Sequence, residues 1–255
     1  MCGDYATMTR NPSIDGLWKS VRSGRQAFQS SQLSGLPEAA RRYLEHAIAP
    51  GVLLVSAVRL RMHGEIKLGR WLPFTAEQVI DWGHAMIWSA TVRMNGMPVR
   101  GFDRLVDGEG AMRWKLFGII PIMTASGPDI TRSAAGRVMA ESVWLPSVLC
   151  GGDVAWTAQD SLHPHARLTV QGETGELAIT IDDTGALKTV NLPRWGNPGE
   201  SGFHYVDFGG VAEEERRFGG YTIPARLRVG WYVGTDRDEP DGEFFRVTID
   251  DAVYR

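Results

Sequence analysis

A regular alternation of apolar and polar residues runs through the middle of this sequence and limits its possible folds more than any other feature. Within 58–68, Val58, Leu60 and Met62 alternate with Arg59 and Arg61. The same period of two recurs in 86–94. Successive side chains of a β-strand point to opposite faces, so these segments are typical of strands with one buried and one hydrated face.

Turn signals separate the alternating segments. Asn95-Gly96 and Gly219-Gly220 suit tight hairpins, and Asp107–Gly110 and Asp182–Gly185 suit slightly longer turns. Further strands are expected at 99–106, 111–123, 177–181, 187–192, 223–233 and 243–253. Strands joined by such close turns predict one large antiparallel sheet, strongly curled.

Helical spacing is confined to two parts of the chain. Before residue 50, Ser13 is a candidate N-cap and Pro37 suits a first helical turn. At mid-chain, Ser126 and Asp129 fit a capping box that begins a helix over 127–142. We expect this helix to cover the concave side of the sheet.

These elements predict an α+β fold that is mainly antiparallel β. Residues 1–50 form an N-terminal helical extension, and residues 51–255 form a curled β domain, a half-barrel wrapped around one inner helix. The 43% hydrophobic content supports one packed core of this kind.

Charge and cysteine content exclude several classes of protein. The formal net charge of −3 offers no basic surplus for nucleic acid. The sequence shows neither a signal-peptide pattern nor an apolar run of roughly 20 residues, so we expect no integral membrane segment and a cytoplasmic location. Cys2 and Cys150 are not expected to form a disulfide. Oligomeric state is not predicted.

Charged residues next to apolar positions of the inner helix are candidates for chemistry. Arg137 and Glu141 are four residues apart and therefore neighbours on one face. Asp103 occupies the apolar face of its strand, where an unpaired charge is costly. We consider Glu141, Asp129 and Asp103 as proton donors or acceptors. Structural ion pairs are the commoner explanation for such groups.

Cations and aromatic side chains supply candidate ligand-binding groups. Arg132 and Arg137 could bind an oxyanion or a carboxylate. A β cup can enclose one small ligand, and five tryptophans are candidate lining residues, although aromatic side chains more often fill a core. They are Trp88, Trp114, Trp144, Trp195 and Trp231.

Cofactor and metal motifs are not found. The sequence contains neither a phosphate-binding glycine loop nor a dinucleotide fingerprint. His163 and His165 have no third ligand nearby in the sequence. We expect neither a cofactor nor a metal.

Several short runs resemble an uncharacterised bacterial domain family, the domain of unknown function numbered 6544. The longest is Gly127-Pro128-Asp129-Ile130-Thr131-Arg132-Ser133-Ala134-Ala135-Gly136-Arg137, and shorter ones are Arg100–Arg104, Trp144–Pro146, Arg194–Gly196 and Phe218–Pro224. The resemblance covers 36–252. It implies a half-barrel similar to lipid-binding cups of the lipoprotein-carrier type, and it implies no catalytic residues.

Three functions are compatible with these features. The first is binding of an apolar small molecule in the cup, with cofactor-independent acid/base chemistry of the cyclase, isomerase or dehydratase type. The second is a non-catalytic carrier of a lipid or another hydrophobic ligand. The third is a protein-interaction module that acts through an exposed apolar patch or strand edge.

Overall fold

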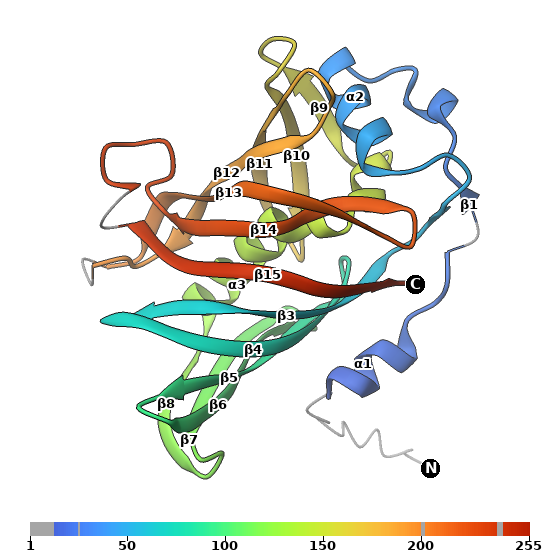
Figure 1. Cartoon of the computed structure of the whole chain (residues 1–255). Helices are drawn as coiled ribbons and strands as arrows, with labels where there is room; N and C mark the ends of the chain where they lie inside the picture. The colour runs from blue at the N-terminus through green and yellow to red at the C-terminus, as the bar shows by residue number, and fades with distance from the viewer. Residues whose placement is uncertain (1–12, 25, 200–201, 239–241) are drawn as a thin grey trace, which may run out of the picture.

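One antiparallel sheet of 13 strands organises the computed structural model, which describes residues 13–24, 26–199, 202–238 and 242–255 (Figure 1). The first part is a meander in which each strand pairs with the next. Its strands are β3 (Ala57–Leu68), β4 (Arg70–Asp81), β5 (Ala85–Met94), β6 (Met97–Val106), β7 (Glu109–Leu116) and β8 (Ile120–Ser126).

A second run of strands completes the sheet on the other side of β3. The last strand of the chain pairs with β3 and joins the two runs. These strands are β9 (Ala155–Ala158), β10 (Pro164–Val170), β11 (Glu173–Ile181), β12 (Leu187–Gly196), β13 (His204–Phe218), β14 (Tyr221–Trp231) and β15 (Glu243–Tyr254).

The sheet is open, because its edge strands β8 and β9 do not pair with each other in the described part of the chain. The expected strong curl is wrong: the sheet is neither closed nor strongly curled. It bends gradually over its 13 strands, as the normal twist between neighbouring strands allows. Helix α3 (Pro128–Ala140) lies on the concave face and contacts strands of both runs, from β6–β8 and from β10–β12.

The main core fills the space between this concave face and the helices. Helix α2 (Glu38–Ala47) buries Tyr43 and Leu44 there, and α3 buries Val138 and Met139. Helix α1 (Ile14–Ser20) instead packs Leu17 on the outer face of β4 and β5. A short pair, β1 (Gln26–Ala27) and β2 (Leu53–Leu54), connects the N-terminal part to the sheet. The 3₁₀ helices are Ser30–Leu33, Glu141–Trp144 and Pro146–Cys150.

Local predictions agree with the structure where turn chemistry is strong. Ser13 caps α1 by accepting a hydrogen bond from the Gly16 amide (3.1 Å). Asn95 and Gly96 both have positive φ, as the predicted hairpin requires.

Two local predictions are wrong. The expected strand at 111–123 is two strands, β7 and β8, because Phe117 and Gly118 adopt positive φ and reverse the chain. The expected capping box is also absent: Ser126 ends β8, and Gly127 is the N-cap of α3 with no side-chain cap. Residues 1–12, which include Cys2, lie outside the described residues.

Candidate ligand-binding site

A pocket of about 390 Å³ lies between α3 and the concave face of the sheet. Its wall is mostly apolar, and aromatic side chains make up much of it. They include Trp88, Trp144, Phe208, Trp231, Phe244 and Phe245. A larger hollow of about 730 Å³ lies on the outer face beside α1, but it is wide open and Arg61, Glu77 and Arg104 border it. The inner pocket therefore offers the better enclosure for an apolar molecule.

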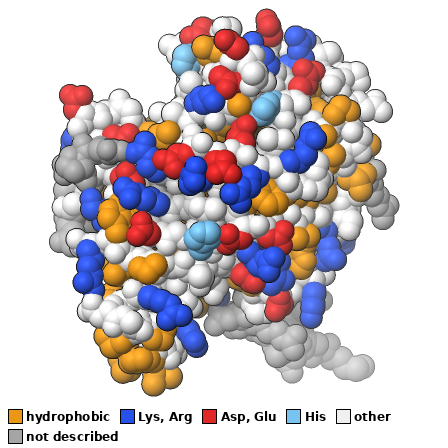
Figure 2. Space-filling view, in the orientation of Figure 1, with side chains coloured by type: hydrophobic (Ala, Val, Ile, Leu, Met, Phe, Trp, Pro, Cys, Tyr) orange, Lys and Arg blue, Asp and Glu red, His pale blue; other side chains and the backbone are white. Residues whose placement is uncertain are grey.

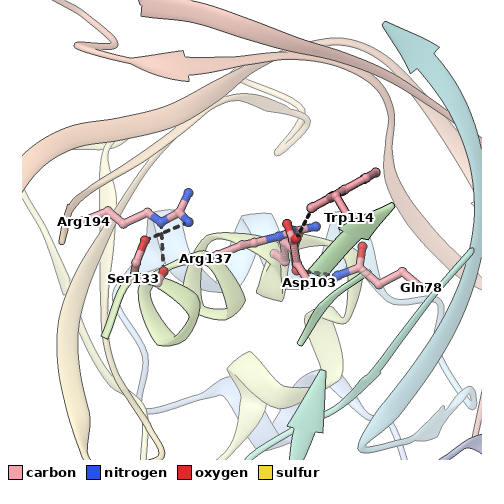
Figure 3. A network of polar contacts seen from close by, with 7 residues as sticks. Gln78, Asp103, Trp114, Ser133, Arg137 and Arg194 are labelled. Atoms are coloured by element: carbon pink, nitrogen blue, oxygen red, sulfur yellow. Dashed lines mark hydrogen bonds and ion pairs between the residues drawn. The ribbon is translucent and has the colours of Figure 1, made fainter. Parts of the chain in front are cut away.

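Arg137 connects two of the three candidate carboxylates, Asp103 and Glu141, at the wall of this pocket (Figure 3). From α3 its Nε donates to Glu141 Oε1 over 2.7 Å, and its Nη1 donates to Asp103 Oδ2 over 3.1 Å. Trp114 Nε1 donates to the other Asp103 oxygen over 3.2 Å. The predicted proximity of Arg137 and Glu141 is confirmed, and the structure adds Asp103 to this pair.

Gln78 and Trp88 also contact the charged groups of this network. Gln78 of β4 donates from Nε2 to Glu141 Oε2 over 2.6 Å, so every carboxylate oxygen of Asp103 and Glu141 accepts a hydrogen bond. The guanidinium of Arg137 also lies 5.1 Å from the ring centroid of Trp88. Charges paired in this way tolerate an apolar surrounding.

The environment raises the pKa of both Asp103 and Arg137, but for different reasons. Burial raises the pKa of Asp103, although the charge of Arg137 and the hydrogen bond from Trp114 oppose the shift. Burial alone would lower the pKa of Arg137, but the Glu141 and Asp103 carboxylates outweigh it and raise that pKa. Arg137 therefore stays charged.

Arg194 is a second cation of the pocket wall, and its pairing differs from that of Arg137. From β12 it donates to the Ser133 carbonyl (2.9 Å) and to Ser133 Oγ (3.2 Å). Its guanidinium lies over Phe208 and Trp231, and in the described residues no carboxylate is within ion-pair distance. Figure 3 shows its far end pointing away from α3 into the space enclosed by the strands. Burial, followed by the charge of Arg137, lowers the pKa of Arg194 to about 9.

Two polar atoms near the pocket lack a partner in the described part of the chain. They are Nε1 of Trp88, which is 2% exposed and lines the pocket, and Oε1 of Gln78, which is 0% exposed. A buried polar atom without a hydrogen bond is costly. The Trp88 N–H is therefore an unpaired donor buried at the pocket wall.

The other predicted site residues form a separate cluster outside the pocket. Asp129 accepts a hydrogen bond from Trp195 Nε1 (2.8 Å), and Arg132 lies over the Trp195 ring and pairs with Glu173 (3.1 Å). None of Asp129, Arg132 and Trp195 lines the pocket. Trp114 packs behind the wall against Trp88, with 5.7 Å between ring centroids.

Sequence reasoning missed Gln78 and Arg194. Gln78 belongs to β4, a strand that the sequence analysis did not identify. Arg194 could have been found from alternation, because it shares a face of β12 with the buried residues Val190 and Leu192. The neighbouring residue Trp195 was predicted to line the site instead, because it is aromatic.

Three further features of the described residues concern metal ligands, a free thiol and helix length. No group of three or more His, Cys, Asp or Glu side chains there could hold a metal ion. Burial raises the pKa of the Cys150 thiol to about 12, so it is a poor nucleophile. None of the described helices has the length and apolar character needed to span a membrane.

The fold and pocket define a class: an antiparallel β protein with an open sheet and a pocket between the sheet and an inner helix. Residues 34–254 match a family of unknown function, DUF6920, and the chain belongs to that family. The family number 6544, expected from the sequence motifs, is wrong. The curated proteins contain no match.

The solved structures that resemble this chain include the following two. One is a LolA superfamily protein from Nitrosomonas europaea, with 10% identity, a TM-score of 0.44, and coverage of 85% of this chain and 92% of that one. The other is a putative outer membrane lipoprotein-sorting protein domain from Vibrio parahaemolyticus, with 6% identity, a TM-score of 0.41, and coverage of 78% and 86%. At these TM-scores neither likeness defines the function of this chain.

Proposed function

We propose that this protein binds a hydrophobic small molecule or a lipid in the pocket beside α3 and carries it without changing it. The observation that supports this is the pocket itself, about 390 Å³ in volume with a mostly apolar and aromatic wall. Binding sites for small apolar ligands have this size and character. The cytoplasmic location stays a prediction.

We further propose that the ligand has one polar or anionic end, placed at Arg194. The guanidinium lines the pocket and has donors that Ser133 does not use. A carboxylate or phosphate could accept from these donors, and bonds to charged groups are the stronger ones. The apolar body of the ligand would then contact Phe208, Val229 and Trp231.

Ligand carriage has better support than acid/base chemistry. Arg137 donates to one oxygen of Asp103 and one of Glu141, while Trp114 and Gln78 donate to the other two. A general acid or base needs a free position within reach of its substrate. The raised pKa of Asp103 is the observation that favours catalysis as a second function.

A neutral fluorescent probe, N-phenyl-1-naphthylamine, tests the binding proposal. We expect saturable binding of one probe per chain and displacement by fatty acids. Val229→Trp should remove binding by filling the pocket, whereas Val253→Trp on the exposed end of β15 should not. Equal binding by both variants would overturn the proposal.

Mass spectrometry of the displaced ligand tests the alternative function. After prolonged incubation, a carried ligand is recovered with its original mass and retention time. Conversion that Asp103→Asn abolishes, while probe binding persists, would establish chemistry in place of carriage.

A further inference from the structure

One end of the sheet exposes an unusual group of apolar side chains. Five of them form what we call the β8 patch, on the turn after β7 and on edge strand β8. They are Phe117 (49% exposed), Ile119 (72%), Ile120 (52%), Ile122 (51%) and Met123 (47%). Figure 2 shows apolar side chains gathered at the lower left, where Figure 1 places the turn of this hairpin. A contiguous exposed apolar patch commonly marks an interaction site.

The charges around the β8 patch are of one sign. Segments 85–102 and 110–128 contain Arg93, Arg100, Arg113 and Lys115 and no Asp or Glu. Arg100 and Lys115 are cross-strand partners next to the turn that carries Phe117. None of these four cations forms an ion pair in the described parts of the chain. The patch therefore has a cationic border, which is complementary to an anionic surface.

The pocket lies toward the same end of the sheet as the β8 patch. The turns at Gly69, at Asn95-Gly96 and at 117–119 all lie at this end, because β3–β8 is an antiparallel meander. Ile66 of β3 pairs with Phe245 at the start of β15, and both residues line the pocket.

We propose that the β8 patch docks on an anionic lipid bilayer. The apolar side chains would enter the interfacial region while Arg100 and Lys115 remain at the level of the headgroups, as in other proteins that lie on membranes. Docking in this orientation would bring the pocket end of the sheet to the lipid, so that a ligand could pass between them. Only this transfer step rests on the proposed function.

A second copy of this chain is a less suitable partner for the same surface. Pairing of two β8 edges would bring two cationic faces together, which is unfavourable. Pro121 is the second residue of β8 and has no N–H to donate to an added strand.

Flotation with vesicles tests the docking. We expect the protein to float with phosphatidylcholine vesicles that contain phosphatidylglycerol, and to float less with pure phosphatidylcholine or at high salt. The double variant Ile119→Asp/Ile122→Asp should lower the bound fraction about tenfold or more, because carboxylates resist burial in lipid. Arg100→Glu/Lys115→Glu should remove the preference for anionic vesicles.

Matched controls keep the result interpretable. Val253→Asp changes an equally exposed apolar residue (48%) at the opposite end of β15 and should float like the wild type. Circular dichroism and binding of N-phenyl-1-naphthylamine in solution report folding and the pocket. A wild type that binds the probe but does not float overturns the docking alone, and one that floats without binding the probe overturns only the proposed function. A dimer in light scattering that Ile122→Asp dissociates would overturn membrane docking in favour of a second copy.

Discussion

Arg137 of α3 and Asp103 of β6 form an ion pair across the pocket wall, with 3.1 Å between Nη1 and Oδ2. The same guanidinium pairs with Glu141 one turn further along the helix. The pair thus fixes the inner helix to the sheet at the point where the pocket begins. This ion pair should therefore affect both the stability of the fold and the shape of the pocket.

Replacing Arg137 with Met should destabilise the protein strongly. Asp103 and Glu141 would remain in an apolar surrounding without their cation, and breaking a buried pair in this way costs about 3–5 kcal/mol. The free energy of unfolding in urea, followed by tryptophan fluorescence, measures the loss. Arg132→Met, which removes the more exposed pair with Glu173, is the control and should change stability much less. Equal losses in the two variants would contradict the buried network.

Replacing Arg194 with Met should weaken binding of anionic ligands selectively. Loss of charge-assisted hydrogen bonds should reduce the affinity for a fatty acid about tenfold or more. The affinity for its methyl ester and for N-phenyl-1-naphthylamine should stay nearly the same, because these molecules carry no anionic end. Isothermal titration calorimetry can compare the two ligands on each protein. Parallel losses for acid and ester would mean that Arg194 only shapes the pocket.

Gly110→Ala should disturb the contact between β7 and α3. A Cβ atom at Gly110 would lie 2.5 Å from Thr131 Cα and 2.6 Å from its amide nitrogen, so the helix would have to shift. Forced overpacking of this kind costs about 1–3 kcal/mol. Gly35→Ala is the matched control, since nothing lies within 4 Å of a Cβ there. Thermal unfolding should show a lower Tm for Gly110→Ala only.

The pair of His46 and Glu215 should make stability depend on pH. Their Nε2 and Oε2 atoms lie 2.8 Å apart, and this hydrogen bond is the main reason that the pKa of His46 is raised above its usual 6.5. Since the folded pKa exceeds the unfolded value, the stabilisation is complete below the unfolded pKa and is lost as pH rises through the folded pKa.

His46→Gln is the variant that isolates this effect. The Tm difference between wild type and variant should be larger at about pH 5.5 than at about pH 8.5. A difference that is the same at both pH values, or larger at the higher one, would show that protonation of His46 does not stabilise the fold.

Alternation and turn chemistry predicted much of the sheet, but close backbone contacts remained hidden. Gly209-Gly210 has the composition of a turn, yet both residues lie inside β13. A Cβ atom at Gly209 would lie 2.0 Å from the Val190 carbonyl oxygen. Glycine is therefore needed there because two strands approach closely, and no local pattern distinguishes this reason from a turn.

Sequence reasoning found residues of the pocket wall where a charge broke an apolar pattern. Asp103 and the pair of Arg137 and Glu141 met that condition, and they do lie together at the pocket. Asp129 and Arg132 were grouped with them because they share α3, but a helix turns by about 100° per residue. Ile130 and Ser133 of the same helix line the pocket, whereas Asp129 and Arg132 do not. Gln78 joins the network through a contact across 63 positions of sequence, which no local pattern contains.

Photo-cross-linking measures the central claim most directly. A fatty acid that carries a diazirine on its chain is bound to the protein in solution, activated by light, and located by peptide mass spectrometry. We expect adducts on pocket residues such as Ile66, Val229 and Phe244, and we expect unlabelled fatty acid to compete them away. Adducts confined to the β8 patch, or spread over the surface without competition, would contradict a ligand held beside α3.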